Sequence, residues 1–189
     1  MLRTQTTRPT PGAVKTLDAA ERLFSVRGIH AVGVEVIATE AGVTKRTLYD
    51  RFGSKDALVE AYLRRRHEQW WAQLQQRLAC AAAPAVLAVF DAYLAASDHP
   101  GHGCPFLNAA GELPDGHPGL QVVMDHKRQV REEVGRLVEV DLADAAPAEL
   151  GEHLFLLLEG GIAHRGIDTG VDHLRAARAL AEQLMAAAQ

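Results

Sequence analysis

The sequence AGVTKRTLYDRFGSKDAL, residues 41–58, decides the fold of this chain. Apolar residues recur at helical intervals on both sides of Gly42, so two short helices are expected to meet at that glycine. Glycine tolerates the backbone conformation that a tight turn between two helices requires. Two short helices joined in this way form a helix-turn-helix, and the sequence predicts that motif over residues 34–51.

The helical period extends from this stretch over most of the chain. The expected helices cover residues 10–27, 34–41, 44–51, 54–82, 85–97, 104–110, 119–140, 148–163 and 171–188. Prolines fall between these segments or at their starts, where they interrupt a helix least. No run shows the alternating, turn-bounded pattern of a strand. The sequence therefore predicts an all-α protein of about nine helices.

Charge is distributed unevenly along the chain, whose formal net charge is −4. Residues 1–66 carry 12 Lys and Arg against 7 Asp and Glu, a net charge of +5. Residues 67–189 carry 8 against 17, a net charge of −9. A basic front joined to an acidic back indicates that only the front meets a polyanion.

Composition excludes several classes of protein. Of the 189 residues, 48% are hydrophobic, which argues against disorder and allows one sizeable core or two small ones. No apolar run is long enough for a membrane span, and the start has no apolar stretch typical of a secretion signal. We expect a cytoplasmic protein. Cys80 and Cys104 are too few for a disulfide scaffold and lack metal-ligand spacing, so no metal and no cofactor are expected.

The first turn of the second short helix carries an unusual set of side chains. Thr44 is expected to cap this helix, which leaves Lys45, Arg46 and Thr47 in its first turn. Two cations at a helix N-terminus oppose the helix dipole. A phosphate group would relieve that conflict, because its negative charge offsets the two cations. A helix whose N-terminus points into a groove brings such side chains to the nucleic-acid backbone.

Two further residues extend the candidate surface. Tyr49 lies one turn beyond the cations, where its hydroxyl can reach a phosphate and its ring a thymine methyl group. Ser54 is expected to cap the next helix and to place Lys55 in its first turn. Taken singly, Tyr49 is also compatible with a half-buried packing role, and Lys55 with an ordinary solvated lysine. Together with the first-turn cations, they favour a nucleic-acid surface.

The block from Val14 to Ala61 resembles the DNA-binding domain of the TetR family of bacterial transcriptional regulators. The matching motifs stand in the family's order as Leu23-Phe24, Gly28, Ile37-Ala38, Ala41-Gly42-Val43, Thr47-Leu48-Tyr49, Phe52, Ser54-Lys55-Asp56 and Leu58. The resemblance covers about a quarter of the chain. One departure is Gly33, which stands where the family has a capping Thr or Ser and which removes a hydroxyl that could touch phosphate.

The resemblance implies a homodimeric repressor that reads a palindromic operator and is released by a small molecule. It implies a helix-turn-helix domain at residues 1–55, connected by the helix from Ser54, and an effector-binding and dimerisation domain at residues 56–189. Thr44, Tyr49 and Lys55 match phosphate-contacting positions in the family, and Lys45, Arg46 and Thr47 match those nearest the bases. The implied partners are double-stranded DNA, a second copy of the chain and an unknown effector, with no membrane.

The second domain contributes two further sets of candidates. Aromatic and polar residues on the middle helices are expected to line an effector pocket: Trp70, Phe90, Tyr93, Phe106, Asn108, Met124, His126 and Phe155. Apolar and small residues on the last two helices are expected to form the dimer interface: Leu154, Leu157, Leu158, Gly161, Leu174, Ala177, Leu180 and Leu184. For both sets, packing inside one subunit is the alternative interpretation.

Other functions are also compatible with parts of the sequence. Cys104 near a helix start could act as a thiol redox sensor, and the histidines of HPGHGCPF, residues 99–106, could bind a metal, although a loop with surface histidines is favoured. A helical protein-interaction module with a basic head is a second alternative. An enzyme is not expected, because no nucleophile elbow, phosphate loop or HExxH motif is present.

Overall fold

The computed structural model describes residues 10–96, 103–143, 149–165, 167 and 172–188. Within these ranges the chain forms nine helices, as predicted. They are α1 (Pro11–Arg27), α2 (Val34–Ala41), α3 (Lys45–Phe52), α4 (Lys55–Leu78), α5 (Leu87–Ala95), α6 (Pro105–Glu112), α7 (Pro118–Leu142), α8 (Leu150–Ala163) and α9 (His173–Ala187). The predicted helix end at residue 97 and the predicted helix starts at residues 148 and 171 lie outside the described residues.

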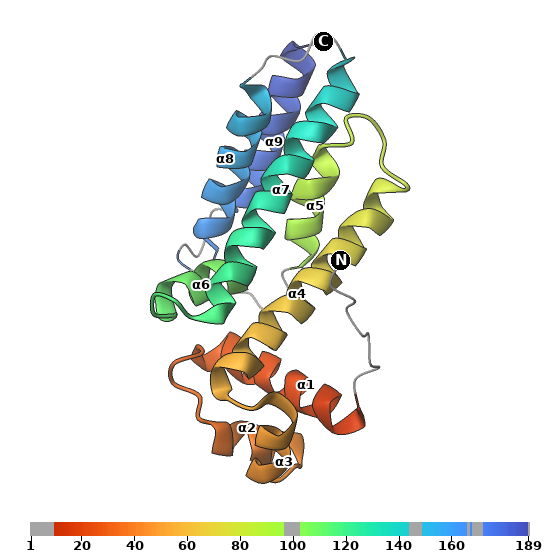
Figure 1. The fold of residues 1–189 in the computed structure, drawn as a ribbon. Coiled ribbons are helices and arrows are strands. Elements are labelled where there is room, and N and C mark those ends of the chain that lie inside the picture. Colours follow the sequence, from red (N-terminus) through yellow and green to blue (C-terminus); the bar gives the residue numbers. More distant parts are fainter. Residues whose placement is uncertain (1–9, 97–102, 144–148, 166, 168–171, 189) are drawn as a thin grey trace.

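The helices form a head and a body that share one long helix. The head consists of α1, α2 and α3, and α4 runs from it into the body, where it lies beside α5 and α7 (Figure 1). In the body, α7 packs on α8, and α8 packs on α9, while the short α6 lies at the end of the body nearest the head (Figure 1). In the described part of the chain, every helix is too short or too polar to cross a lipid bilayer.

Local sequence signals explain the boundaries of the two short head helices. The Thr44 hydroxyl accepts a hydrogen bond from the Thr47 N–H at 3.0 Å, and the Ser54 hydroxyl accepts one from the Ala57 N–H at 3.0 Å. Both are N-caps of the predicted kind. Gly42 ends α2 with φ of 64°, a left-handed conformation that glycine adopts without strain. These caps fix the angle at which α3 leaves α2.

The head core is built on one face of each helix. Leu48 of α3 is fully buried with Ile37 and Ala38 of α2, and Phe24 of α1 meets Tyr62 of α4 edge to face at 5.3 Å between ring centroids. These residues belong to the same hydrophobic cluster as the core of the body. The head is therefore not closed by its own three helices, because α4 supplies part of its core.

Polar contacts join the head to the body beside this shared helix. Arg66 of α4 pairs with Glu21 of α1 at 2.7 Å. The backbone N–H of His30, in the loop between α1 and α2, donates to the Glu112 carboxylate at the end of α6, at 2.7 Å. The buried His117 side chain lies 3.4 Å from Asp56 in the first turn of α4. The end of α6 and the start of α7 thus hold the head from the body side.

Helices α8 and α9 approach each other closely at Gly161. A Cβ atom at this position would lie 2.8 Å from the Leu174 Cα atom and 3.2 Å from the His173 carbonyl oxygen. Real Cβ atoms do not approach backbone atoms so closely, so a larger residue would force the two helices apart. Glycine at 161 therefore sets the distance between the two helices.

Candidate functional site

The first turn of α3 presents a row of polar side chains to solvent. Thr44, Lys45, Arg46 and Tyr49 are exposed, and Thr47 is half-buried, whereas Leu48 between them is fully buried. The helical period accounts for this division, because residues 45, 46 and 49 share the face opposite Leu48. The Tyr49 side chain is 39% exposed and is not sealed into the head core. This exposure leaves the side chain accessible for the predicted surface role.

The two first-turn cations have different surroundings. The Lys45 ammonium group pairs with the Glu35 carboxylate of α2, and this pair raises the pKa of Lys45 and lowers that of Glu35. Arg46 has a side chain that is 91% exposed, and its nearest carboxylate, Asp50, is 3.9 Å away. Water screens exposed pairs of this kind, so each cation can exchange its carboxylate for a phosphate at little cost. The dipole conflict is therefore partly relieved within the chain at Lys45 and remains largely unrelieved at Arg46.

Lys55 makes a contact that the sequence does not reveal. Its ammonium group donates to the Ile29 carbonyl oxygen at 2.8 Å and ties the start of α4 to the loop after α1. The side chain is half-buried, so it is not an ordinary solvated lysine. An ammonium group carries three donors. Two of them remain for another acceptor, so this contact is compatible with the predicted phosphate contact.

The candidate pocket residues separate into a central group and an outer group. Trp70 of α4, Phe90 and Tyr93 of α5, Phe106 of α6 and His126 of α7 are all buried. Asn108 is exposed, the Met124 side chain is 57% exposed, and Phe155 is half-buried. Asn108 and Met124 lie on exposed faces of their helices, outside the buried group.

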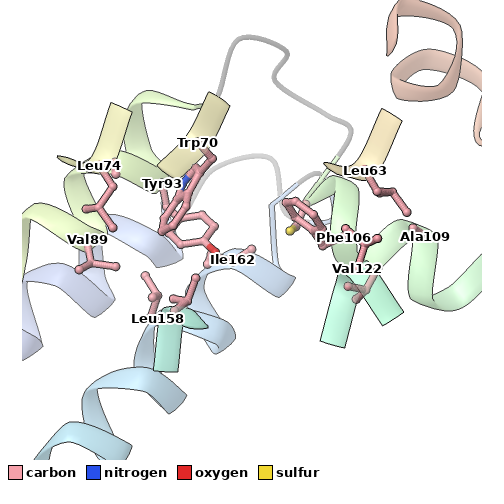
Figure 2. Packing of buried hydrophobic residues seen from close by; sticks show 14 of the residues in the cluster. Leu63, Trp70, Leu74, Val89, Tyr93, Phe106, Ala109, Val122, Leu158 and Ile162 are labelled. Atoms are coloured by element: carbon pink, nitrogen blue, oxygen red, sulfur yellow. The ribbon is translucent and has the colours of Figure 1, made fainter. Parts of the chain in front are cut away.

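His126 is the centre of the buried group. Its ring stacks on Phe106 at 3.7 Å between centroids and meets the edge of Trp70 at 5.2 Å. Figure 2 shows the Trp70 and Tyr93 rings lying together, and their centroids are 4.7 Å apart. The His126 Nε2 atom lies 3.0 Å from the Tyr93 hydroxyl, and its Nδ1 atom lies 3.0 Å from Nδ1 of His67 on α4. His67 was missed by sequence reasoning, because nothing in its spacing shows that it faces α7.

Burial keeps His126 and its partners neutral. Desolvation lowers the pKa of His126 to about 2, with smaller contributions from the charges of Lys127 and His67. Desolvation also lowers the pKa of His67 and raises that of Tyr93 well above its usual value. Three ionisable side chains therefore share hydrogen bonds without carrying charge at neutral pH.

The depressed pKa of His126 predicts a loss of stability in acid. Between pH 6.5 and the folded-state pKa, the unfolded chain binds a proton at His126 that the folded chain does not, so stability falls as the pH falls. We expect this residue to contribute a loss of about 1 kcal/mol for each pH unit below 6. Urea unfolding at pH 7, 6, 5 and 4 should therefore give a shallower pH dependence for His126→Gln than for the natural chain. Equal pH dependence in the two proteins would contradict a neutral buried histidine.

The candidate dimer residues also divide in two. Leu154, Leu158, Gly161, Leu174 and Ala177 are buried inside the single chain, so they hold α8 and α9 in its own core. Leu157 and Leu184 are half-buried, and Leu180 is exposed together with the unpredicted Leu156. Only this second set has side-chain surface that a second copy could cover.

The cysteine and histidine alternatives gain little support. Cys104 is buried, whereas reactive thiols are ordinarily accessible. His99 and His102, the candidate metal ligands in the sequence, lie outside the described residues.

Comparison with known proteins gives matches in sequence and matches in three-dimensional structure. Residues 17–62 match the sequence pattern of the family described as "Bacterial regulatory proteins, tetR family". An uncharacterised HTH-type transcriptional regulator of Mycobacterium tuberculosis, Rv1255c, is 38% identical over 73 residues, which cover 39% of this chain and 36% of that protein. The HTH-type transcriptional activator FasR of Mycolicibacterium smegmatis is 42% identical over 62 residues, covering 33% and 28%. The matches thus span about a third of the length of these curated relatives.

The likeness in three dimensions extends over nearly the whole chain. The crystal structure of SCO4454, a TetR-family transcriptional regulator from Streptomyces coelicolor, is 28% identical in sequence and superimposes with a TM-score of 0.83. The superposition covers 94% of this chain and 96% of that protein. Sequence similarity therefore concentrates in the head, and structural similarity includes the body.

Proposed function

The chain belongs to the TetR family of helix-turn-helix transcriptional regulators, a non-enzymatic family, and on this basis we propose that it is a DNA-binding repressor. In this proposal, α3 enters the major groove. Lys45, Arg46 and Thr47 lie nearest the bases, and Thr44, Tyr49 and Lys55 contact phosphates. The observation that carries it is the exposed first turn of α3. This turn has a capped N-terminus and an almost fully exposed arginine, and an exposed tyrosine follows one turn later on the same face.

Binding to DNA upstream of its own gene tests this proposal. An electrophoretic mobility shift assay should show a complex with that duplex at protein concentrations that leave a scrambled duplex free. The logarithm of the affinity should fall linearly with the logarithm of the salt concentration, because cationic side chains displace counterions from phosphates. Binding that ignores salt, or that is equal for the two duplexes, would contradict the proposal.

The repressor direction needs a test of its own, since FasR, one of the relatives, is described as an activator. A reporter gene placed behind the bound DNA should be expressed more strongly when the regulator gene is deleted. Lower expression after deletion would assign activation instead.

We infer that the chain works as a homodimer through the accessible side of α8 and α9. Leu156, Leu157, Leu180 and Leu184 supply the apolar surface for a two-fold contact. Two recognition helices about 34–36 Å apart would read adjacent major grooves of a palindromic site. Light scattering of the purified protein should give twice the mass of one chain, and Leu180→Arg should reduce it to one chain.

We further propose that a small-molecule effector acts on the head through α6. This helix of eight residues carries Phe106, stacked on His126, near its start and Glu112, bonded to the His30 N–H, at its end. Any ligand that shifts Phe106 would therefore also disturb a contact with the head. A ligand that favours the shifted arrangement would lower operator affinity by its preference for that arrangement.

The link at Glu112 gives a prediction that needs no effector. Glu112→Ala removes the acceptor of the His30 N–H, so we expect this amide to exchange with solvent about tenfold faster. Glu112→Gln keeps an oxygen acceptor of the same reach and should exchange at nearly the natural rate. Hydrogen exchange followed by NMR measures both rates. Unchanged exchange in Glu112→Ala would show that α6 does not hold the head.

A further inference from the structure

The aromatic group around His126 has the composition of a ligand site for one chemical class. Four helices contribute rings to it, with Trp70 from α4, Tyr93 from α5, Phe106 from α6 and His126 from α7. The Phe106 and His126 rings lie nearly parallel, with 12° between their planes and 3.7 Å between their centroids. This spacing is that of two flat rings in full contact, so the face of His126 accepts a flat aromatic partner.

Charged groups near these rings are committed to other contacts. The Lys127 ammonium group is bonded to both Glu159 carboxylate oxygens at 2.8 Å. The Arg165 guanidinium group donates to the Tyr93 carbonyl oxygen at 2.6 Å. The histidines in the group are neutral because burial lowers their pKa values. An anionic ligand would lose its hydration here and would have to compete with Glu159 for Lys127 and with the Tyr93 carbonyl oxygen for Arg165.

One polar atom in this group has no partner. Trp70 is 7% exposed, and among the described residues its indole Nε1–H finds no hydrogen-bond acceptor. A buried donor without an acceptor is costly, and native proteins rarely keep one without a reason. The indole N–H can only donate. A molecule that satisfies it must bring an acceptor into the aromatic group.

We propose that the effector is an uncharged, planar aromatic compound with a carbonyl-type acceptor, which stacks on His126 in place of Phe106 and accepts a hydrogen bond from Trp70 Nε1–H. This assignment deepens the proposed function, since it names the class of molecule for the effector site of a regulator. Displacement of Phe106 moves the start of α6, whose other end is bonded to the head through Glu112.

The alternatives fit these contacts less well. An organic anion would have to displace Glu159 from Lys127 or the Tyr93 carbonyl oxygen from Arg165. A quaternary ammonium ion would gain attraction from the ring faces, but it offers no acceptor and leaves the Trp70 N–H unpaired. A purely apolar ligand would also leave that donor unpaired. The presence or absence of one acceptor is therefore the property to test.

Two pairs of compounds isolate the acceptor. 9-Fluorenone and xanthone are flat, uncharged ketones, and fluorene and xanthene have the same ring systems with a CH2 group in place of the carbonyl. Equilibrium dialysis against the full-length protein, without DNA, should show each ketone bound at least about tenfold more tightly than its partner. Failure of both ketones to bind, or equal affinity within each pair, would overturn the proposal. Tighter binding of fluorenone-4-carboxylate or benzyltrimethylammonium would also overturn it.

Single substitutions assign the contacts. Trp70→Phe removes the N–H and keeps a ring, so the preference for the ketone should shrink to less than about threefold. Trp71→Phe is the matched control, because this neighbouring, half-buried tryptophan stacks on His67 and not on His126. It should keep the full preference. Phe106→Leu removes the ring that competes for His126 and should tighten binding of both members of each pair several-fold. Loss of the ketone preference in Trp71→Phe instead of Trp70→Phe would contradict the assignment.

The dialysis separates this proposal from the proposed function. Ketone binding with no operator binding would leave the ligand class standing and refute the regulator role. Operator binding with no ketone binding would support the regulator role and refute the ligand class.

Discussion

Replacing Arg46 by glutamate is expected to weaken operator binding about a hundredfold. The Arg46 side chain is 91% exposed, and its only carboxylate neighbour among the described residues is 3.9 Å away. In the proposed complex, the substitution would remove a side chain that lies near the bases and would add a negative charge beside the DNA backbone. Fluorescence anisotropy with labelled upstream DNA at one fixed salt concentration measures the change.

A control with the same change of charge separates contact from net charge. Arg128 on α7 is exposed in the body and pairs with Asp125 at 2.7 Å. Arg128→Glu makes the chain equally more negative at a site remote from α3, and we expect less than a threefold effect on operator affinity. Equal effects of the two substitutions would mean that overall charge, and not α3, governs DNA binding. Little effect of Arg46→Glu would remove α3 from the interface.

Replacing Gly161 by valine is expected to lower the free energy of unfolding by about 3 kcal/mol or more. The first atom of the new side chain would lie 2.8 Å from the Leu174 Cα atom, and backbone cannot yield as a flexible side chain can. The α8–α9 contact would have to open along its length. Urea unfolding followed by circular dichroism at one protein concentration measures the loss.

The adjacent glycine provides the control. Gly160 lies on the same helix, but a Cβ atom there would have no neighbour within 4 Å. Valine has a slightly better helix propensity than glycine, so Gly160→Val should change stability by less than about 0.5 kcal/mol. If both substitutions were equally harmful, the cause would be the valine itself or a partner covering Gly160, and not the close approach of α9.

The sequence was sufficient for the helices because their signals are local. Periodic apolar residues give each helix its buried face, and the ends follow from caps such as Thr44 and Ser54 and from Gly42. The expected end of α4 at residue 82 lies beyond the observed end at Leu78, because the alanine-rich stretch after Leu78 has no clear stop signal. In α3, the helical period accounts for the burial of Leu48 and for the exposed face that residues 45, 46 and 49 share.

The sequence was insufficient where the partner of a side chain comes from a distant segment. Helical spacing shows that Leu154 and Leu158 face apolar surroundings, but it does not show whether their own chain or a second copy provides them. It gives Met124 and His126 no distinguishing mark, although one is exposed and the other is fully buried. The contacts of His67 with His126 and of Glu112 with the His30 N–H join residues 59 and 82 positions apart. Such pairs depend on how the helices are rotated in the bundle.

The shared helix α4 limits how such a protein can be recombined. Tyr62 packs on Phe24, and the fully buried Leu58 and Leu63 belong to the same continuous core. A fragment cut at residue 55, the predicted end of the head domain, would expose the apolar side chains of the head that pack on α4. A chimera that joins this head to another body must include the first two or three turns of α4. The direction of α4 then determines how the head is oriented on the new body. Related proteins can therefore exchange their heads only at crossover points inside helix α4, and not in a linker.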